Sequence, residues 1–202
     1  IIEIRDTEHF FFQLNMFQEA LEKHSATKQK VWKPNVKAMT KNWLNMGLRP
    51  RAVTRDMEWG INLPLSEEKW DTKRIYVWFE AVQGYLTCSQ IWSEKYADSH
   101  DWKKWWTRSE DGNEPKHIYF MGKDNIPFHT VIWPAIIMGL NSARSGKPPS
   151  SNIENGELVL ESNVPAMEYL MLQGGQFSKS RKHAVWLPSF LENHDPDTLR
   201  YF

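Results

Sequence analysis

Gly122-Lys123-Asp124-Asn125-Ile126-Pro127-Phe128-His129 is the segment that decides the fold, because it joins two patterns of opposite kind. Before it, His117–Met121 (HIYFM) is a β-branched and aromatic run typical of a strand. After it, a helical pattern continues to Leu140. A second such run, Arg74–Phe79 (RIYVWF), is also followed by a glycine-containing turn and a helical pattern. This alternation predicts an α/β fold with a parallel, doubly wound sheet.

Helices are predicted on the N-terminal side of this sheet. Residues 15–23 have a helical pattern that opens with Asn15 as a candidate N-cap. A second amphipathic helix is predicted from Pro34 to Met46, with Pro34 at a helix-start position and Gly47 at a helix-stop position.

The C-terminal third is predicted to contain more loop. Residues 141–156 are rich in Ser, Asn, Gly and Pro and predict a loop or linker. Beyond it come a short strand at Tyr169–Leu172, a turn at Gly174-Gly175 and a basic, serine-rich loop. Residues 195–202 are typical of the beginning of a helix.

The composition excludes several classes of protein. The 202 residues are 41% hydrophobic, which is enough for a globular core, and their formal net charge is zero. Cys88 is the only cysteine, so neither a disulfide framework nor a multi-cysteine zinc site is expected within this chain. No apolar run reaches the ~18 residues of a membrane span. The prediction is a cytoplasmic protein with no membrane partner, and an organelle is the open alternative.

Two local features depart from this neutral average. Residues 25–55 hold eight Lys and Arg and no acid, which predicts either a solvated basic face or a phosphate-contacting one. The eleven tryptophans are too many for core filling alone, so some are expected to line a surface or a pocket.

The segment after Met121 also carries the candidate chemistry. Ligands of open parallel sheets bind at the carboxyl ends of the strands. There Gly122 would let the backbone approach a nucleotide, and Asp124 would accept hydrogen bonds from ribose hydroxyls. His129 and Trp133 stand four residues apart on one helix face. The alternative is that Asp124 caps the helix and His129 is a satisfied core residue.

Four strings resemble methionyl-tRNA synthetases, and they occur in that family's order. They are FMGKDNIPFHTVIWPAIIMGL from Phe120, YVWFEAVQGY from Tyr76, VTRDMEWGINLP from Val53 and EYLMLQGGQFSKSR from Glu168. The resemblance runs through nearly the whole chain. It implies the second half of a class I, Rossmann-like catalytic domain, preceded by a helical segment from the end of an inserted domain.

The resemblance implies a methionine site and a nucleotide site. Its methionine-binding positions match Trp78, Ala81, Tyr85, Asn125 and His129, although Val82-Gln83 departs from the pattern of many members. Its ATP and adenylate positions match Gly122, Asp124, Phe177, Ser178, Lys179 and Ser180. Lys179 would be the catalytic cation, with ATP and Mg²⁺ as cofactors and methionine and tRNA(Met) as the other partners. Gln176 replaces a lysine of the family's loop. We expect the adenosine side and the Lys179 loop to serve one nucleotide.

The family's HIGH signature, which completes the ATP site, occurs nowhere in the 202 residues. The chain is therefore interpreted as a fragment, with residues 1–52 ending the inserted segment, 53–145 forming the second half of the catalytic domain, and 146–202 forming the signature-loop segment and the start of a helical domain. A non-catalytic module that binds tRNA or a protein is one alternative. A class I synthetase for another apolar amino acid is the other.

Overall fold

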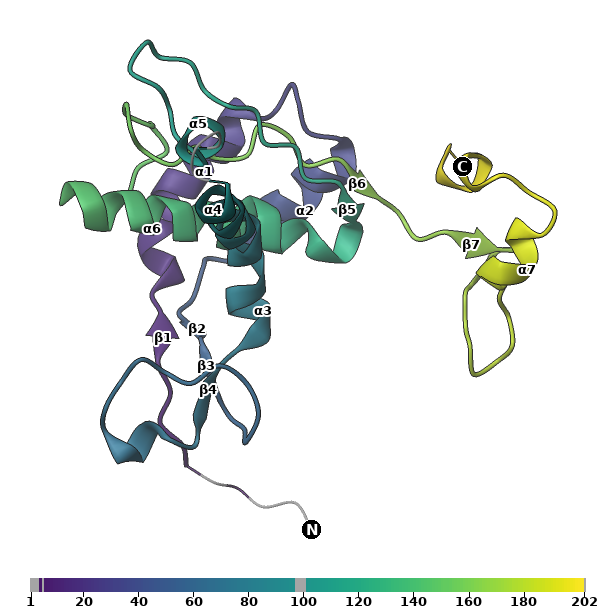
Figure 1. Ribbon diagram of the computed structural model, residues 1–202, viewed down its shortest axis with the longest axis horizontal. Coiled ribbons are helices and arrows are strands. Elements are labelled where there is room, and N and C mark those ends of the chain that lie inside the picture. The colour runs from purple at the N-terminus through teal and green to yellow at the C-terminus, as the bar shows by residue number, and fades with distance from the viewer. Residues whose placement is uncertain (1–3, 5, 97–100, 202) are drawn as a thin grey trace. The chain divides into compact units, whose positions relative to one another are not determined.

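The computed structural model describes residues 4, 6–96 and 101–201. It divides into two compact units, Ile1–Ala166 and Met167–Phe202, which are described separately (Figure 1). The predicted domain limits at residues 52 and 145 come from the family's organisation and stay predictions.

The first unit begins with two packed helices. The chain passes from β1 (Phe11–Phe12) through a 3-10 turn at Leu14–Phe17 into α1 (Gln18–Thr27), and α2 (Pro34–Asn45) packs against α1. The predicted second helix is confirmed to within one residue. The first is confirmed in place, but the predicted cap is wrong: Asn15 lies inside the 3-10 turn, and Gln13 precedes that turn.

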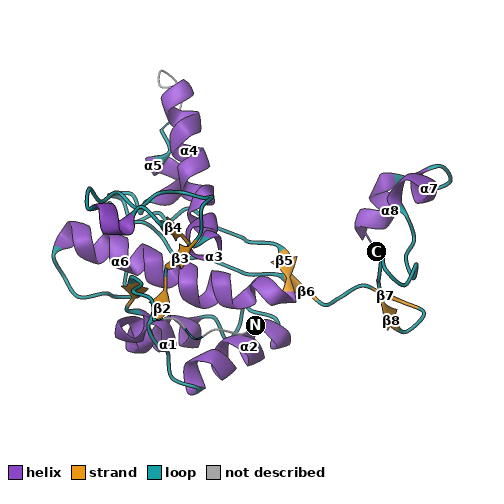
Figure 2. Cartoon of the chain, turned by 90° about the horizontal axis from the view of Figure 1, so that it is seen from below, coloured by secondary structure: helices purple, strands orange, loops and turns teal. Residues whose placement is uncertain are grey.

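Two antiparallel strand pairs follow α2. β2 (Arg51–Ala52) pairs with β1, and β3 (Thr54–Asp56) pairs with β4 (Lys73–Ile75). Between β3 and β4 lies a loop with one 3-10 turn at Glu68–Trp70. Figure 2 shows how short these strands are beside the helices.

The strand predicted over Arg74–Phe79 is only half correct. Strand β4 ends at Ile75, and α3 (Val77–Glu80) begins two residues later, followed by a 3-10 turn at Ala81–Gln83 and α4 (Gly84–Lys95). A run of six residues is too short for its periodicity to separate a strand from a short helix.

The predicted parallel pairing is present in the middle of the first unit. After α5 (Lys103–Trp106), the chain runs extended beside residues 163–165, with a parallel bridge between Ile118 and Asn163. The amide of Tyr119 donates to the carbonyl of Asn163 at 3.1 Å. The run predicted as one strand is thus largely extended, but its regular part is β5 (Met121–Gly122), which pairs with β6 (Ala166–Met167).

A long helical stretch follows β5. It begins with a 3-10 turn at Lys123–Asn125, passes through a π-helical turn at Phe128–Ile132 and continues as α6 (Trp133–Ser145). Residues 123–145 are long and apolar enough to cross a membrane, but 72% of their most apolar window is buried inside the protein. This is the central core helix. It runs five residues further than predicted and ends at Gly146 in a left-handed conformation (φ 70°).

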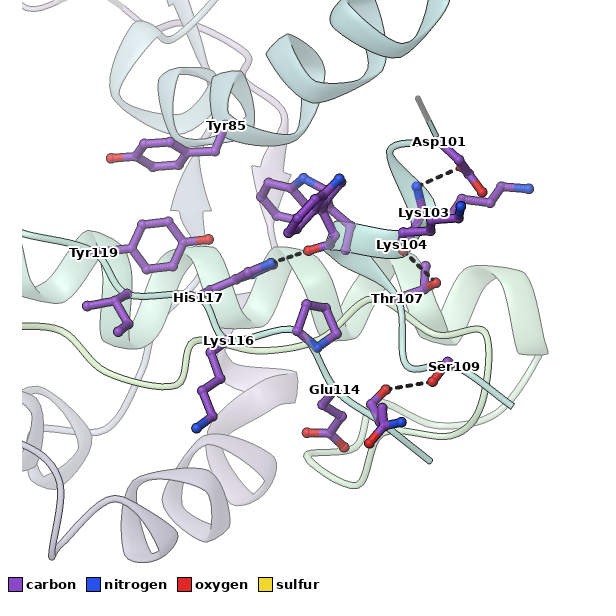
Figure 3. Close-up of a pocket in the computed structure, with 15 residues that line it drawn as sticks. Tyr85, Asp101, Lys103, Lys104, Thr107, Ser109, Glu114, Lys116, His117 and Tyr119 are labelled. Atoms are coloured by element: carbon purple, nitrogen blue, oxygen red, sulfur yellow. Dashed lines mark hydrogen bonds between the residues drawn. The ribbon is translucent and has the colours of Figure 1, made fainter. Parts of the chain in front are cut away.

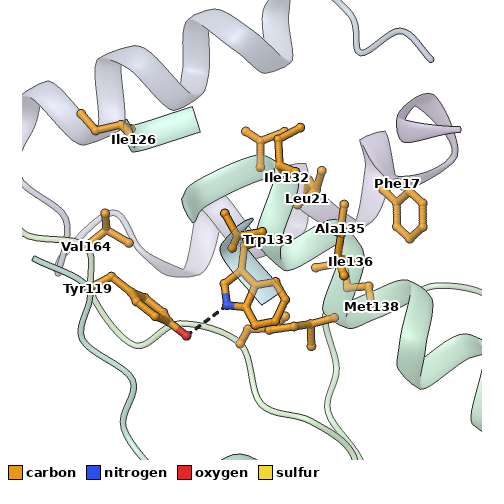
Figure 4. Packing of buried hydrophobic residues seen from close by; sticks show 14 of the residues in the cluster. Phe17, Leu21, Tyr119, Ile126, Ile132, Trp133, Ala135, Ile136, Met138 and Val164 are labelled. Atoms are coloured by element: carbon orange, nitrogen blue, oxygen red, sulfur yellow. Dashed lines mark hydrogen bonds between the residues drawn. The ribbon is translucent and has the colours of Figure 1, made fainter. Parts of the chain in front are cut away.

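The core of the first unit is built around Trp133. Its side chain is fully buried, and its indole Nε1 donates to the hydroxyl of Tyr119 at 3.0 Å (Figure 4). Apolar side chains from α1, α6 and the extended strands surround it, among them Leu21, Ile137 and Val164. The indole fills a large volume here because its one polar atom is satisfied.

The second unit is a hairpin followed by two short helices. β7 (Met171–Leu172) pairs with β8 (Gly175–Gln176), and α7 (Leu187–Leu191) and α8 (Pro196–Tyr201) follow the loop. The predicted turn is displaced by one residue. Gln173 and Gly174 both have positive φ angles, of 51° and 78°, and Gly175 already belongs to β8. Such a two-residue turn matches the twist of the two strands.

Candidate functional site

Tyr85 and His129 form the centre of the candidate site. Tyr85 lies in the first turn of α4, and His129 lies in the π-helical turn that precedes α6. The Tyr85 hydroxyl is 3.0 Å from Nε2 of His129, and Nδ1 of the same ring is 2.9 Å from the carbonyl oxygen of Asn125. Since a carbonyl only accepts, Nδ1 carries the proton, and the Tyr85 hydroxyl donates to Nε2.

This arrangement keeps the His129 ring neutral. Burial lowers the pKa of His129, and the hydrogen bond to Asn125 opposes that effect only in part. A neutral imidazole in an apolar wall carries no charge that would have to be desolvated when a ligand excludes water.

A second tyrosine, Tyr119, lies beside Tyr85 and His129. The ring of Tyr119 lies 5.0 Å from that of Tyr85 and 5.3 Å from that of His129, measured between centroids. Burial raises the pKa of Tyr119 well above its usual range. Tyr119 was not among the predicted site residues. Its place two residues before Met121, near the end of the extended run, was the available signal.

Trp78 and Ala81, also predicted to bind methionine, lie on neighbouring turns before α4. Trp78 is 53% exposed, and its ring centroid is 5.6 Å from that of Phe128, the residue before His129. Trp78 lines a cavity of about 380 Å³ together with Phe128, whereas Tyr85 lines another cavity. The structure therefore links Tyr85 and the Asn125 carbonyl to opposite nitrogens of the His129 ring, and it places Trp78 against Phe128.

The cavity beside Tyr85 has a volume of about 810 Å³. In Figure 3, His117 lies between Tyr119 and the basic residues Lys103 and Lys104. Nε2 of His117 donates to the carbonyl of Trp105 at 2.6 Å, so the buried Nδ1 is an acceptor, and it has no hydrogen-bond partner within the described residues. Burial lowers the pKa of His117. Sequence reasoning missed this histidine because it lies inside a run predicted only as a strand.

Gly122 and Asp124 lie where the sequence predicts, directly at the carboxyl end of β5. Gly122 has an ordinary extended backbone, and a Cβ atom added to it would meet no atom of the protein within 4 Å. Nothing within the protein therefore demands glycine at this position. Asp124 is exposed in the following 3-10 turn.

The serine-lysine-serine loop lies in the second unit and is closed on itself. The backbones of Ser178 and His183 exchange two hydrogen bonds of 2.9 and 3.0 Å, and the amide of Lys182 donates to the carbonyl of Lys179 at 3.1 Å. Nε2 of His183 also donates to the carbonyl of Leu172 in the hairpin at 2.8 Å. Phe177 and Lys179 are exposed. Sequence reasoning missed His183, which fixes the base of this loop.

No group of three or more His, Cys, Asp or Glu side chains suited to a metal ion occurs in residues 4, 6–96 and 101–201.

Comparisons with known proteins point to one family along the whole chain. The family model of tRNA synthetases class I (M) matches residues 2–202. A methionine–tRNA ligase of Roseiflexus sp. (strain RS-1) is 41% identical over 203 residues, which cover 100% of this chain and 32% of that protein. One from Dehalococcoides mccartyi (strain CBDB1) is 44% identical over 199 residues, which cover 98% and 32% respectively. The chain thus spans about a third of the length of the curated relatives it matches.

A solved structure, Mycobacterium tuberculosis methionyl-tRNA synthetase in complex with methionyl-adenylate, matches with a TM-score of 0.69 at 25% identity, over 97% of this chain and 33% of that one. The predicted α/β fold of a class I catalytic domain is confirmed. The chain belongs to the class I (M) family of tRNA synthetases.

Proposed function

We propose that the natural protein carrying this chain is a methionine–tRNA ligase. It activates methionine with ATP to give methionyl-adenylate and pyrophosphate, and then transfers the methionyl group to the 3′ end of tRNA(Met). The contact between Tyr85 and His129, at positions that the family resemblance assigns to methionine, supports this function most directly. The relatives named methionine–tRNA ligase and the neighbour bound to methionyl-adenylate support the same substrate.

In this proposal the methionine side chain is bound by Trp78, Ala81, Tyr85, Asn125 and His129. A thioether is apolar and polarisable, and it interacts favourably with aromatic edges at about 5 Å. The neutral state of His129, stabilised by its burial, suits such a side chain better than an imidazolium would.

Gly122 and Asp124 would bind the adenosine, with the Asp124 carboxylate accepting hydrogen bonds from the ribose. The open space beside Gly122 supports this role, since a ligand backbone or sugar could approach there. Phe177, Ser178, Lys179 and Ser180 would bind the phosphates. Mg²⁺ would enter with ATP, held by the phosphate oxygens.

Adenylate formation would be an in-line displacement at the α-phosphorus. A methionine carboxylate oxygen forms a bond to that phosphorus, and the bond from phosphorus to the bridging oxygen of the β-phosphate breaks, so pyrophosphate leaves. Lys179 would stabilise the negative charge that develops on the transferred and leaving groups. We assign no covalent role to any residue of the chain.

The proposed location of the enzyme and the organisation of the chain follow from this function. We propose a cytoplasmic enzyme in which residues 1–52 end an inserted segment, residues 53–145 complete the catalytic domain, and residues 146–202 carry the signature loop into a helical domain.

Methionine-dependent exchange of labelled pyrophosphate into ATP tests the proposal on the natural protein. Exchange with methionine, and little with leucine or isoleucine, is the expected result. Exchange that depends on another apolar amino acid would replace methionine as the substrate. The 202-residue chain by itself is expected to give no exchange, because it carries no HIGH signature.

A further inference from the structure

Trp106 is joined to Tyr85 by a hydrogen-bonded serine. Trp106 ends α5 and is 6% exposed, and its indole Nε1 lies 2.9 Å from Oγ of Ser89 in the middle of α4. The same Oγ lies 3.0 Å from the carbonyl oxygen of Tyr85, one helical turn earlier. A buried tryptophan of one helix is therefore linked, through a single hydroxyl, to the backbone of a candidate methionine-binding residue in another.

The directions of these two hydrogen bonds follow from the groups involved. An indole N–H can only donate, so the Ser89 hydroxyl accepts from Trp106. A carbonyl oxygen can only accept, so the single proton of that hydroxyl is donated to Tyr85. The phenol hydroxyl of Tyr85 in turn donates to Nε2 of His129, whose Nδ1 donates to the carbonyl of Asn125. All four hydrogen bonds between Trp106 and Asn125 therefore form together, without competition for a proton.

Trp106 is itself held on several sides. Its ring meets that of His117 edge-on at a centroid distance of 4.4 Å, and that of Trp133 at 6.1 Å. Its carbonyl accepts from the amide of Val159 at 2.9 Å, which ties the end of α5 to the extended segment before β6. A large side chain packed in this way has little freedom to change its rotamer. It is therefore a rigid support for the hydroxyl of Ser89.

Helix α4 depends on such support because little of it is buried. The structure describes all of its residues, Gly84–Lys95, and its buried side chains are Leu86 and Ser93. Tyr85 itself is 45% exposed. A first turn with one buried leucine gains little from apolar burial. The hydrogen bond from Ser89 to the backbone of this turn therefore contributes a substantial part of what fixes the direction of the Tyr85 side chain.

We propose that Trp106 and Ser89 are positioning residues for the methionine site. They hold the first turn of α4 in the place from which the Tyr85 hydroxyl reaches His129, and neither residue contacts the methionine itself. This inference rests on the proposed function, and both residues lie outside the four strings that carry the family resemblance. Without the Ser89 hydroxyl, Tyr85 loses its fixed position and the His129 ring loses its donor.

The test is pyrophosphate exchange by the natural protein at varied methionine concentration. Ser89→Ala (S89A) is expected to raise the KM for methionine about 2- to 12-fold, the range for loss of one hydrogen bond, and to leave kcat and the KM for ATP within about 2-fold. Trp106→Phe (W106F) keeps a ring in the core but removes the N–H, and it is expected to act in the same direction. The double variant S89A/W106F should add less than about 2-fold to the larger single effect, because both changes break one link.

A control and two further variants separate positioning from a general loosening of α4. Ser93→Ala (S93A) removes a hydroxyl one turn further on, where Ser93 Oγ accepts from the amide of Trp102 at 3.2 Å, and it should leave the KM for methionine within about 2-fold. S89T keeps a hydroxyl that can donate to the carbonyl four residues earlier, and it should recover most of the loss. In a Y85F background, S89A should raise KM less than about 2-fold further, since the phenol hydroxyl that it positions is already gone.

Three results would overturn the inference. An unchanged KM in S89A with a native thermal melt would remove Ser89 from the positioning of Tyr85, and it decides the matter even if W106F does not fold. Equal rises in S89A and S93A would mean that any loosening of α4 weakens methionine binding. Fully multiplicative effects of S89A and Y85F would mean that Ser89 acts independently of the Tyr85 hydroxyl.

The inference and the proposed function fail separately. A crystal structure of the S89A variant needs no catalysis, and in it the distance from the Tyr85 hydroxyl to Nε2 of His129 is expected to exceed about 3.5 Å. That lengthening, in a protein without methionine-dependent exchange, would leave the support of Tyr85 in place and remove methionine as the ligand. Normal exchange together with an unchanged distance would remove only the inference.

Discussion

The hydroxyl of Tyr85 donates to Nε2 of His129 over 3.0 Å, joining α4 to the π-helical turn before α6 across 44 residues of sequence. The opposite nitrogen of the ring donates to the carbonyl of Asn125. One histidine is therefore fixed in both its tautomer and its orientation, and it presents a neutral face to the neighbouring aromatic rings.

Removing the hydroxyl of Tyr85 is expected to leave the His129 ring less firmly oriented. Tyr85→Phe should raise the KM for methionine about 2- to 12-fold, which corresponds to the loss of one hydrogen bond of about 0.5–1.5 kcal/mol. Pyrophosphate exchange at varied methionine concentration measures it. Tyr96→Phe, on a tyrosine of the same 45% exposure at the end of α4, is the control and should leave KM unchanged. Equal KM values for the two variants would remove Tyr85 from the site.

The buried histidine also predicts how stability depends on pH. Burial lowers the pKa of His129 in the folded state, so below about pH 6.5 the unfolded state binds more protons than the folded state does. The stabilising contribution is complete above that pH and is lost as pH falls toward the folded pKa. Urea unfolding at pH 7.5 and 5.5 measures this loss. His129→Gln should reduce it, and a variant of the exposed His194 should not.

Loss of the hydrogen bond between Tyr119 and Trp133 is expected to lower the free energy of unfolding. Tyr119→Phe would leave the buried indole Nε1 of Trp133 without its acceptor, at about 1–3 kcal/mol. The urea midpoint followed by tryptophan fluorescence is the measurement. Tyr201→Phe, on a side chain that is 95% exposed, should cost almost nothing. A loss below about 0.5 kcal/mol for Tyr119→Phe would show that this hydrogen bond does not form.

The role proposed for Lys179 predicts an effect on the rate of adenylate formation and not on the binding of methionine. Lys179→Ala is expected to slow adenylate formation about 100-fold or more without a comparable change in the KM for methionine, because the charge it stabilises develops in the transition state. Single-turnover measurement of adenylate provides the rate. Lys182→Gln changes a second exposed cation of the same loop and should have a much smaller effect. Similar losses in both variants would make the loop's total charge, and not Lys179, the cause.

The sequence was most informative where residues with unusual backbone preferences mark the ends of elements. Pro34 and Gly47 predicted α2 to within a residue, since proline fits a helix start and glycine a left-handed stop. It was least informative at Val77–Glu80, where β-branched and aromatic residues form a short helix. The amide of Tyr76 still donates to the carbonyl of Val53 in the register of β3 and β4, and the helix begins at the next residue, so no change of residue type marks the boundary.

The residues of the candidate site were likewise predicted only in part. The family resemblance predicts that Tyr85, Asn125 and His129 bind methionine, and in the structure hydrogen bonds link the other two to His129. It did not locate His117 or Tyr119, because their importance comes from burial beside a cavity and not from any local pattern.

A crystal structure of the natural protein with bound methionine tests the central claim most directly. The account predicts density for the thioether between Trp78 and His129, with the sulfur about 5 Å from an aromatic ring and the Tyr85 hydroxyl still on Nε2. Methionine bound elsewhere, with the Tyr85 and His129 pair facing only water, would contradict it.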